Sequence, residues 1–470
     1  MGIEEQVQAL QELVTVLKQE VAQLRAENEG LRRENEILRR ENEALGRENE
    51  QLVEQLEAGQ SGQPPSFVKA NRAKRERGQR RKRAAKDNRG RRRMAPTRTE
   101  VHEIETCPEC GERLTEGSCY YRREVIDIPP PQAVEVVEHQ VMKGWCWRCR
   151  SWRAAAVDWT GVVVGSGRVG VRLMGLVAYM RARLRIPLRT IQEYVHTAYG
   201  VHLSVGEIND LCRRVVRHLA EGSARLLAEA RASPVLHMDE TGWREDGQNG
   251  YIWCLATDTP QPVRYYEFHR SRSGAVAKEI LGEFGGHLVT DFYAAYNQYS
   301  GLHQRCWVHL LRDLQALQEA HESNGEVVAW ASGVKRLYYY ATEQLATGLP
   351  AAERQHLSAR LRQMVERFGL QYATLYDHPC CTVAKRLLRH QHELFQFVAH
   401  QHVPADNNLA ERALRPLVVQ RKISGGSRSP AGSETRMKLA SLFETWQARR
   451  LNPLLECWQH LGYVLTPAAG

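Results

Sequence analysis

Leucine recurs at every seventh position over residues 6–57, and this repeat restricts the possible folds more than any other feature of the chain. Heptad position d is occupied by Leu10, Leu17, Leu24, Leu31, Leu38, Leu45 and Leu52, and position a by Val7, Val14, Val21, Asn28, Asn35, Asn42, Asn49 and Leu56. β-Branched residues at a with leucine at d favour a parallel two-stranded coiled coil, and asparagine at a fixes its register. A single solvated helix would leave the seven leucines unexplained. Residues 1–58 are therefore predicted to form a homodimeric coiled coil.

Positive charge is concentrated in the next segment, residues 59–100, which follows the helix breakers Pro64 and Pro65. Residues 69–98 contain 15 Lys or Arg and two acids, so the rest of the chain carries a formal net charge of about −3 out of a total of +10. Such a segment buries too little apolar surface to fold alone, and we expect a disordered arm that binds DNA phosphates. The alternative is a solubilising linker. The predicted phosphate-binding residues are Lys69, Arg72, Arg80, Arg81, Lys82, Arg83, Arg91, Arg92 and Arg93.

A membrane is the weaker choice of polyanionic partner. Arg168 and Arg172 interrupt the best apolar stretch, which falls short of the roughly 20 residues of a spanning helix. The first residues lack the basic region of a signal peptide. Eleven cysteines in 470 residues are too sparse for a disulfide scaffold. We therefore expect a protein of the reducing cytoplasm.

Two CxxC pairs predict a zinc ribbon over residues 101–160. Cys107 and Cys110 form one pair, and Cys146 and Cys149 the other. Four thiolates at this spacing suit one tetrahedral Zn²⁺ per chain, with each pair at the tip of a hairpin. The alternating, valine-rich residues 132–141 predict a strand between the pairs.

Residues 161–232 are predicted to be helical. One amphipathic helix covers residues 188–199 and ends at Gly200, and the S-x-x-E box Ser204–Glu207 opens a second helix. The second helix carries Arg213, Arg214 and Arg217. This arrangement fits a DNA-binding helix-turn-helix and fits an ordinary helical hairpin equally well.

From residue 233 the pattern changes to strands. Short apolar stretches predict strands at residues 235–238, 251–257 and 263–268, a helix at 273–284, a strand at 287–290, and a strand with a helix over 303–317. This order is that of an RNase H-like α/β fold, with its first part at residues 233–320. Residues 321–403 are predicted to be a helical insertion. Residues 404–470 should complete the domain, with a last helix opening near Asp406, followed by a tail. The whole is a multidomain α/β protein.

Three acids fall where such a fold could use them together. Asp239 and Asp291 each follow an apolar strand, so they should meet at one sheet edge if these strands are neighbours. On the later helix, Asn408, Glu411 and Arg415 share one face. Three carboxylates can hold two Mg²⁺ or Mn²⁺ ions that activate a nucleophile and stabilise a leaving oxygen. Each acid alone could equally be a cap or a surface carboxylate.

Further residues near these acids are candidates for auxiliary roles. Cys306 and His309 follow the fifth strand, where they could pack as a structural pair, contact DNA or the attacking water, or bind a metal. The sequence offers no further ligand at a usable spacing for them. Arg421 and Lys422 begin a predicted basic, flexible loop suited to phosphate.

These motifs resemble the IS66-type insertion-sequence transposases. The resemblance rests on Asp239-Glu-Thr-Gly-Trp-Arg, Thr290-Asp291-Phe-Tyr, Cys306-Trp-Val-His309 and Asn407-Asn408-Leu-Ala-Glu411-Arg, and covers roughly residues 100–455. It implies a DDE transposase with the triad Asp239, Asp291 and Glu411. Such an enzyme binds the terminal inverted repeats of a mobile element, then cleaves and joins double-stranded DNA with divalent metals, with or without helper proteins.

Two other classes of protein remain as alternatives. A zinc-containing transcription regulator would use the zipper, the basic arm and the ribbon. A bZIP, however, has its basic region before the zipper, and here it comes after. A metal-dependent nuclease would cut without strand transfer, which sequence alone does not separate from a transposase.

The heptad repeat generates a prediction about assembly. Deleting residues 1–58 removes every a and d position, so the shortened protein should be monomeric by light scattering where the full chain is dimeric. A truncated protein that stays dimeric would show that another interface dominates.

Overall fold

The computed structural model describes residue 29 and residues 96–115, 118–119, 121–123, 125–126 and 134–464. Apart from residue 29, the predicted coiled coil and the predicted basic arm up to residue 95 lie outside the described residues. The chain divides into two compact units, residues 1–126 and residues 127–470.

The described part of the first unit contains a tight turn at the first cysteine pair. Gly111 N–H donates to the Cys107 carbonyl at 2.9 Å, and Cys107 N–H donates to the Glu112 carbonyl at 2.8 Å. A bridge between Thr106 and Arg113 closes the turn. Gly111 takes a φ of 78°, a conformation that glycine adopts at no steric cost.

A two-stranded hairpin carries the second cysteine pair. Strands β1 (Lys143–Cys146) and β2 (Ser151–Ala154) are antiparallel, with Trp145 opposite Trp152. The strand predicted at residues 132–141 is wrong for its described part: residues 134–141 form no strand. Their valines are exposed and find no partner strand in the described part of the chain, so alternation alone did not suffice.

Helices occupy most of residues 171–231, directly before the sheet. They are α2 (Val171–Ala182), α3 (Leu188–Tyr199), α4 (Val205–His218) and α5 (Ala220–Arg231). The bounds predicted for the second of these are confirmed, and Gly200 ends it with a φ of 68°. Ser204 caps α4 by accepting the Glu207 N–H at 3.1 Å, as its sequence predicts. The buried faces of these helices share one core with the sheet that follows.

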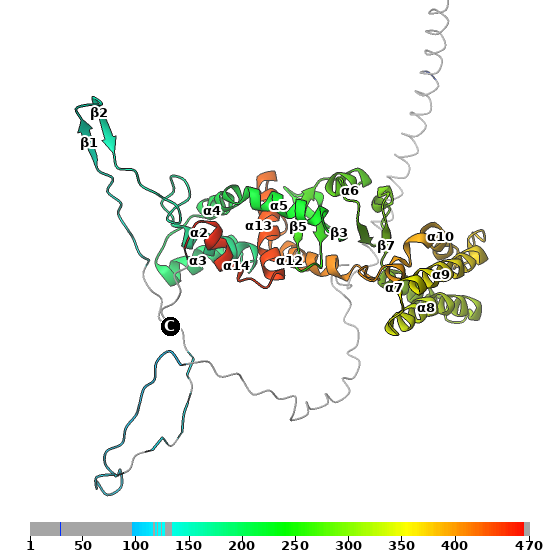
Figure 1. The fold of residues 1–470 in the computed structure, drawn as a ribbon, viewed down its shortest axis with the longest axis horizontal. Coiled ribbons are helices and arrows are strands. Elements are labelled where there is room, and N and C mark those ends of the chain that lie inside the picture. Colours follow the sequence, from blue (N-terminus) through cyan, green and yellow to red (C-terminus); the bar gives the residue numbers. More distant parts are fainter. Residues whose placement is uncertain are drawn as a thin grey trace, which may run out of the picture. The chain divides into compact units, whose positions relative to one another are not determined.

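The sheet has five strands in the order β5-β4-β3-β6-β7. They are β3 (Val235–Glu245), β4 (Gln248–Ala256), β5 (Arg264–His269), β6 (His287–Thr290) and β7 (His303–Arg305). The first three are antiparallel neighbours, whereas β6 and β7 continue the sheet from β3 in parallel. Helix α6 (Gly274–Leu281) joins β5 to β6, and the short 3-10 helix η2 (Ala294–Gln298) joins β6 to β7 (Figure 1).

The first strand of the sheet is longer than its apolar stretch predicts. We expected it to end at Asp239, but β3 continues to Glu245 and pairs with β4 from His237 onward. The two strands meet in a two-residue turn in which Asp246 and Gly247 both have positive φ, 52° and 76°. Turns of this kind match the twist of a hairpin, which lets the pairing extend to the turn.

Helix α7 (Trp307–Ala320) follows β7, where a helix is predicted within residues 303–317. Residues 321–403, for which a helical insertion is predicted, contain α8 (Gly325–Ala346), α9 (Ala351–Tyr372), α10 (Cys381–His390), the 3-10 helix η3 (Gln391–Glu393) and α11 (Gln396–Ala399). These elements build a second core, which reaches the sheet through Val289 and Trp307. The insertion lies at the β7 side of the sheet, whereas α13 and the helices before β3 lie on the opposite side (Figure 1).

Three helices end the described part of the chain, and the prediction of a single last helix is wrong. Helix α12 (Asn408–Ser424) is followed by α13 (Pro430–Ala448) and α14 (Pro453–His460). Ser429 and Asn452 cap the two later helices, and a proline stands in the first turn of each. Phe443 and Trp446 of α13 belong to the main core, so this segment is part of the domain and not a tail.

Candidate active site

The parallel pairing of β3 and β6 brings two acids to the same end of the sheet. The pairing runs from Val235 opposite His287 to His237 opposite Val289. Asp239 lies two residues beyond the part of β3 that pairs with β6, and Asp291 directly follows β6. Both side chains are half-buried. The structure therefore places these two carboxylates at one sheet edge.

Helix α12 is fixed to this edge by one buried asparagine. Asn407, which is fully buried just before the helix, donates from Nδ2 to the Met238 carbonyl at 2.8 Å. Its Oδ1 lies 3.0 Å from His237 Nδ1, and its backbone N–H donates to Cys306 Sγ at 3.2 Å. These bonds place the first turn of α12, which carries Glu411, beside Asp239 and the start of α7.

The electrostatics of Asp239 show that the three acids act on one another. Burial raises the pKa of Asp239 to about 8, and the negative charges of Glu240, Asp291 and Glu411 act in the same direction. The Glu240 N–H, which donates to Asp239 Oδ1 at 2.9 Å, opposes the shift. A divalent cation bound beside Asp239 would stabilise the ionised form of this carboxyl.

One carboxylate oxygen in this cluster lacks any partner. Glu411 Oε1 is buried and makes no hydrogen bond in the structure. Leaving such an oxygen unpaired costs about 1–3 kcal/mol, and more when it is charged. A bound cation would remove this cost, so the acids present fit a divalent metal.

The neighbouring acid Glu240 belongs to the opposite face of β3. Its carboxylate accepts hydrogen bonds from Arg272 at 2.8 Å and from the Tyr296 hydroxyl, and only 8% of the residue is exposed. Successive side chains of a strand alternate between its two faces, which separates Glu240 from Asp239. Its partners give Glu240 a structural role.

A buried arginine holds the backbone at Asp291. Arg305 is completely buried and donates from Nη1 to the Asp291 carbonyl at 2.8 Å and from Nη2 to Asn297 Oδ1 at 2.7 Å. Its Nε donates to Glu393 of the insertion at 2.5 Å. Although burial favours the neutral acid, the His390 hydrogen bond and the Arg305 charge lower the pKa of Glu393 to about 2. The helical insertion thereby braces the loop that carries Asp291.

Cys306 and His309 lie beside the third acid. Cys306 is buried before the first turn of α7, and His309 lies within that turn. His309 Nε2 is 3.7 Å from Glu411 Oε1. The expectation of no further ligand at a usable spacing is wrong: ligand atoms of Cys306, His309 and Glu411 all lie within 4.8 Å of one another. Spacing along the chain concealed this, because 102 positions separate His309 from Glu411.

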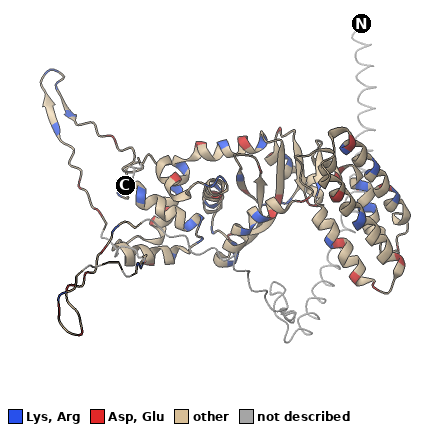
Figure 2. Ribbon diagram, turned by 60° about the horizontal axis from the view of Figure 1, so that its bottom comes forward, with Lys and Arg blue, Asp and Glu red and all other residues tan. Residues whose placement is uncertain are grey.

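The predicted DNA-contacting residues within the described ranges have different surroundings. Arg213 and Arg217 of α4 are exposed, as are Arg415 and Lys422 of α12, whereas Arg214 and Asn408 are half-buried. Arg421 is used internally, because its Nη1 donates to the Gly242 carbonyl and to Thr241 Oγ1. The loop predicted at Arg421 and Lys422 is wrong: both lie in the last turn of α12, which ends at Gly425. Lys and Arg are spread over helices throughout the second unit (Figure 2).

Each cysteine pair has the local geometry of a metal-binding knuckle. Backbone hydrogen bonds from Cys110 and Glu109 lower the pKa of Cys107, and a backbone hydrogen bond from Cys149 lowers that of Cys146. The Cys149 N–H donates to Cys146 Sγ at 3.4 Å. Stabilised thiolates are the form that binds metal.

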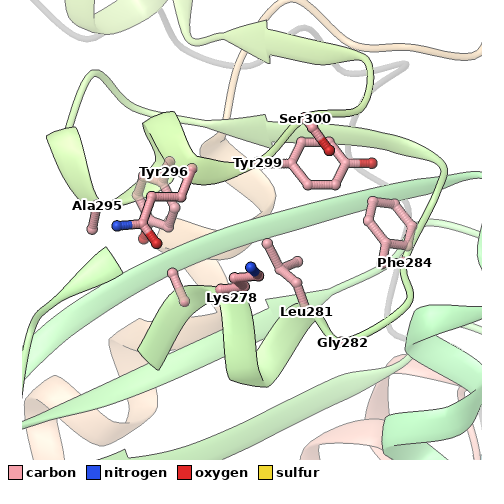
Figure 3. Close-up of a pocket in the computed structure, with 10 residues that line it drawn as sticks. Lys278, Leu281, Gly282, Phe284, Ala295, Tyr296, Tyr299 and Ser300 are labelled. Carbon is pink, nitrogen blue, oxygen red and sulfur yellow. The ribbon is translucent and has the colours of Figure 1, made fainter. Parts of the chain in front are cut away.

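A small pocket lies away from these acids. It measures about 100 Å³ and lies between α6 and η2, lined by Lys278, Phe284, Tyr296 and Tyr299 among others (Figure 3). Pockets for organic cofactors usually measure roughly 300–1,000 Å³, so this one is too small for such a group.

Asn407, Arg305 and Glu393 position the site, and sequence reasoning did not single them out. The run Asp406-Asn407-Asn408 before a helix is a capping signal, and Asp406 Oδ1 accepts the Asn408 N–H at 2.9 Å. This run agrees with the helix start that the sequence predicts near Asp406. Nothing in the sequence pairs Arg305 with Glu393.

Comparison with known proteins identifies the class to which this chain belongs. It is a DNA-processing enzyme of the transposase type. The family model described as "Transposase IS66 family" matches residues 166–435, and the chain belongs to this family. No helix in the described ranges is long and apolar enough to cross a membrane.

Three relatives from Sinorhizobium fredii are similar to the chain and are themselves uncharacterized. Protein y4qI is 24% identical over 391 residues, covering 76% of this chain and 70% of its own length. Protein y4jD is 26% identical over 293 residues, covering 56% of each chain. Protein y4jO is 31% identical over 163 residues, covering 34% of this chain and 47% of its own.

The pKa of Asp239 generates a prediction about metal-free protein. Since this pKa is raised from 3.8 to about 8, the folded state binds more protons than the unfolded state between these values. The stability that Asp239 contributes is thus present below about pH 4 and lost as the pH rises through about 8. We therefore predict the difference in melting temperature between Asp239→Asn and the unsubstituted protein, both measured with a metal chelator present. This difference should shift in favour of Asp239→Asn as the pH rises from about 5 to about 8. An unchanged difference across this range would contradict the environment described for Asp239.

Proposed function

We propose that this protein is a DDE transposase that binds the terminal inverted repeats of a mobile element and catalyses metal-dependent DNA cleavage and strand transfer. The observation that supports this most strongly is the meeting of Asp239 and Asp291 at one edge of the sheet, with α12 and Glu411 tied to the same edge through Asn407. The strand order β5-β4-β3-β6-β7, with three antiparallel strands followed by two parallel ones, is that expected of an RNase H-like domain.

Asp239, Asp291 and Glu411 are the proposed ligands of two Mg²⁺ or Mn²⁺ ions. Such ions, when bound, activate the attacking water or 3′-hydroxyl and stabilise the leaving oxygen. The protein contributes rigid carboxylates in a half-buried setting. Arg305 fixes the backbone at Asp291, and Asn407 fixes the helix of Glu411. Neither residue needs to touch DNA for the acids to stay aligned.

Phosphate contacts are proposed for basic residues on the surface. Arg213, Arg217, Arg415 and Lys422 are exposed and can reach a DNA backbone without losing internal partners other than the Arg213–Asp210 ion pair. The basic segment between residues 69 and 98 is proposed to add sequence-independent affinity. A dimer through the N-terminal heptads would supply one active site for each end of the element.

The two cysteine pairs are proposed to share one Zn²⁺ in a ribbon. This proposal rests on the CxxC spacing and on the thiolate-stabilising turn at each pair. Metal analysis of purified full-length protein should find a zinc content that falls by one ion per chain when Cys107 and Cys146 are both replaced by Ser. Equal zinc contents in the two proteins would remove the ribbon from the account.

The catalytic assignment predicts a shared loss of activity. Replacing Asp239, Asp291 or Glu411 singly with Ala should lower cleavage of an element-end duplex by several orders of magnitude, because each ion needs its ligands. Double substitutions should cost little more than single ones, as expected of residues that act as a unit. Binding to the same duplex, measured by fluorescence anisotropy in Ca²⁺, should stay within a few-fold of the unsubstituted protein.

Glu240 provides the matched control for this prediction. It is adjacent to Asp239 and also carries a carboxylate, but it faces Arg272 and Tyr296 on the other side of β3. Glu240→Gln should retain far more cleavage than Asp239→Asn. The reverse order of activities would show that Glu240, not Asp239, is the metal ligand of this strand.

A further inference from the structure

The end of β7 brings a thiol and an imidazole to the same place as Glu411. Cys306 follows Arg305, the last residue of β7, and its N–H donates to the Thr290 carbonyl at 2.8 Å. This bond holds Cys306 level with the end of β6, directly before Asp291. One turn of α7 then places His309 on the side of Glu411. The cluster is thus built on the same sheet edge as the two aspartates.

The polar atoms of this cluster lack the partners that buried groups normally have. Glu411 Oε1 and His309 Nδ1 are both buried without a hydrogen bond. His309 Nε2 and Glu411 Oε1 are 3.7 Å apart, which is too long for a hydrogen bond between them. Unpartnered polar atoms beside a buried thiol are unusual in a native interior. A cation held between His309 Nε2 and Glu411 Oε1 would give the carboxylate oxygen the partner that it lacks.

The geometry meets the requirement of a single ion. Cys306, His309 and Glu411 each offer one ligand atom, and these three atoms all lie within 4.8 Å of one another. Among the described residues, this is the group of His, Cys, Asp or Glu side chains that meets this distance. Ligands about 2.0–2.3 Å from a tetrahedral ion are separated by less than this limit, so little movement is needed to close the site.

We propose that Cys306, His309 and Glu411 form a coordination site for one divalent transition-metal ion, such as Zn²⁺ or Co²⁺. Mg²⁺ is a poor occupant, because it prefers oxygen ligands in an octahedron, whereas thiolate and imidazole select softer ions. The Asp239 and Asp291 carboxylates offer oxygen only. The sheet edge therefore carries two unlike metal environments that meet at Glu411.

Glu411 can take part in both environments because a carboxylate has two oxygens. Oε1 faces His309, which leaves Oε2 for the aspartate pair. An ion on Oε1 would fix the orientation of the carboxylate and supply the partner that this oxygen lacks. This consequence for cleavage rests on the proposed function, whereas the coordination site itself rests on the three side chains.

Cobalt provides a direct probe, because a thiolate bound to Co²⁺ gives a near-ultraviolet charge-transfer band that oxygen ligands do not. The test uses full-length protein in which Cys107, Cys110, Cys146 and Cys149 are replaced by Ser, so that ribbon thiolates are absent. Anaerobic titration with Co²⁺ should produce the band and saturate it at one ion per chain. Cys306→Ser should abolish the band, whereas Cys457→Ser, at an equally buried cysteine in α14, should leave it intact.

His309→Ala keeps the proposal testable if Cys306→Ser does not fold, since His309 is half-exposed. His309→Ala should weaken Co²⁺ binding by about tenfold or more. Loss of a residue that only supports a metal ligand already lowers affinity by about this factor, and His309 is proposed as a ligand itself. Absence of a thiolate band in the parent protein, or a band that neither Cys306→Ser nor His309→Ala alters, would overturn the site.

Asp291→Asn separates this inference from the proposed function. It should lose cleavage and keep the cobalt band, because Asp291 is not a ligand of the softer site. Retained cleavage with the band present would overturn the proposed catalytic role and leave the site standing. Lost cleavage with no band in the parent protein would overturn the site alone.

Discussion

The attachment of α12 to β3 through Asn407 is the contact on which the candidate site depends. Glu411 is 120 positions from Asp291 in the chain, and the whole helical insertion lies between them. Only a fixed junction can return the third acid to the sheet edge. Asn407 provides it with bonds to the Met238 carbonyl, to His237 and to Cys306, each in a fully buried setting. A buried network in which every polar group has a partner makes the surrounding core rigid and favours one arrangement of its helices and strands.

The helical insertion also helps to hold Asp291 in place. Arg305 joins Glu393 of the insertion to the backbone of Asp291. Although burial favours the neutral form of Glu393, the His390 hydrogen bond and the Arg305 charge keep its pKa low. Arg305 is completely buried, so removal of Glu393 would leave a buried charge without its carboxylate partner. The bridge is therefore a strong constraint on the loop. The two aspartates, Glu411 and the insertion are thereby parts of one connected framework.

Much of the fold could be predicted from local signals, because those signals have local physical causes. Gly200 with its positive φ and Ser204 with its capping bond marked α3 and α4 correctly. The apolar run before Asp291 marked β6. Asp239 was harder: its strand continues through a hairpin turn at Asp246 and Gly247 that apolar patterning does not reveal.

Contacts between distant residues were the part that sequence reasoning missed. Cys306 and His309 carried a recognisable spacing, but their neighbour Glu411 is supplied by a different helix. Arg305 and Glu393 meet only because the insertion folds back onto β7. Helix α13 was taken for a tail because its place in the core depends on the sheet and the helices before it. In each case the missing information was tertiary packing, which no local pattern contains.

The central claim is that the edge of this sheet joins DNA ends as well as cutting them. The most direct test is a strand-transfer assay with full-length protein, a pre-cut element-end duplex bearing a free 3′-hydroxyl, and a target plasmid in Mg²⁺ or Mn²⁺. The account predicts covalent joining of the duplex to the plasmid, abolished by Asp239→Asn and retained by Glu240→Gln. Nicking of the plasmid without any joined product would contradict it and identify a nuclease.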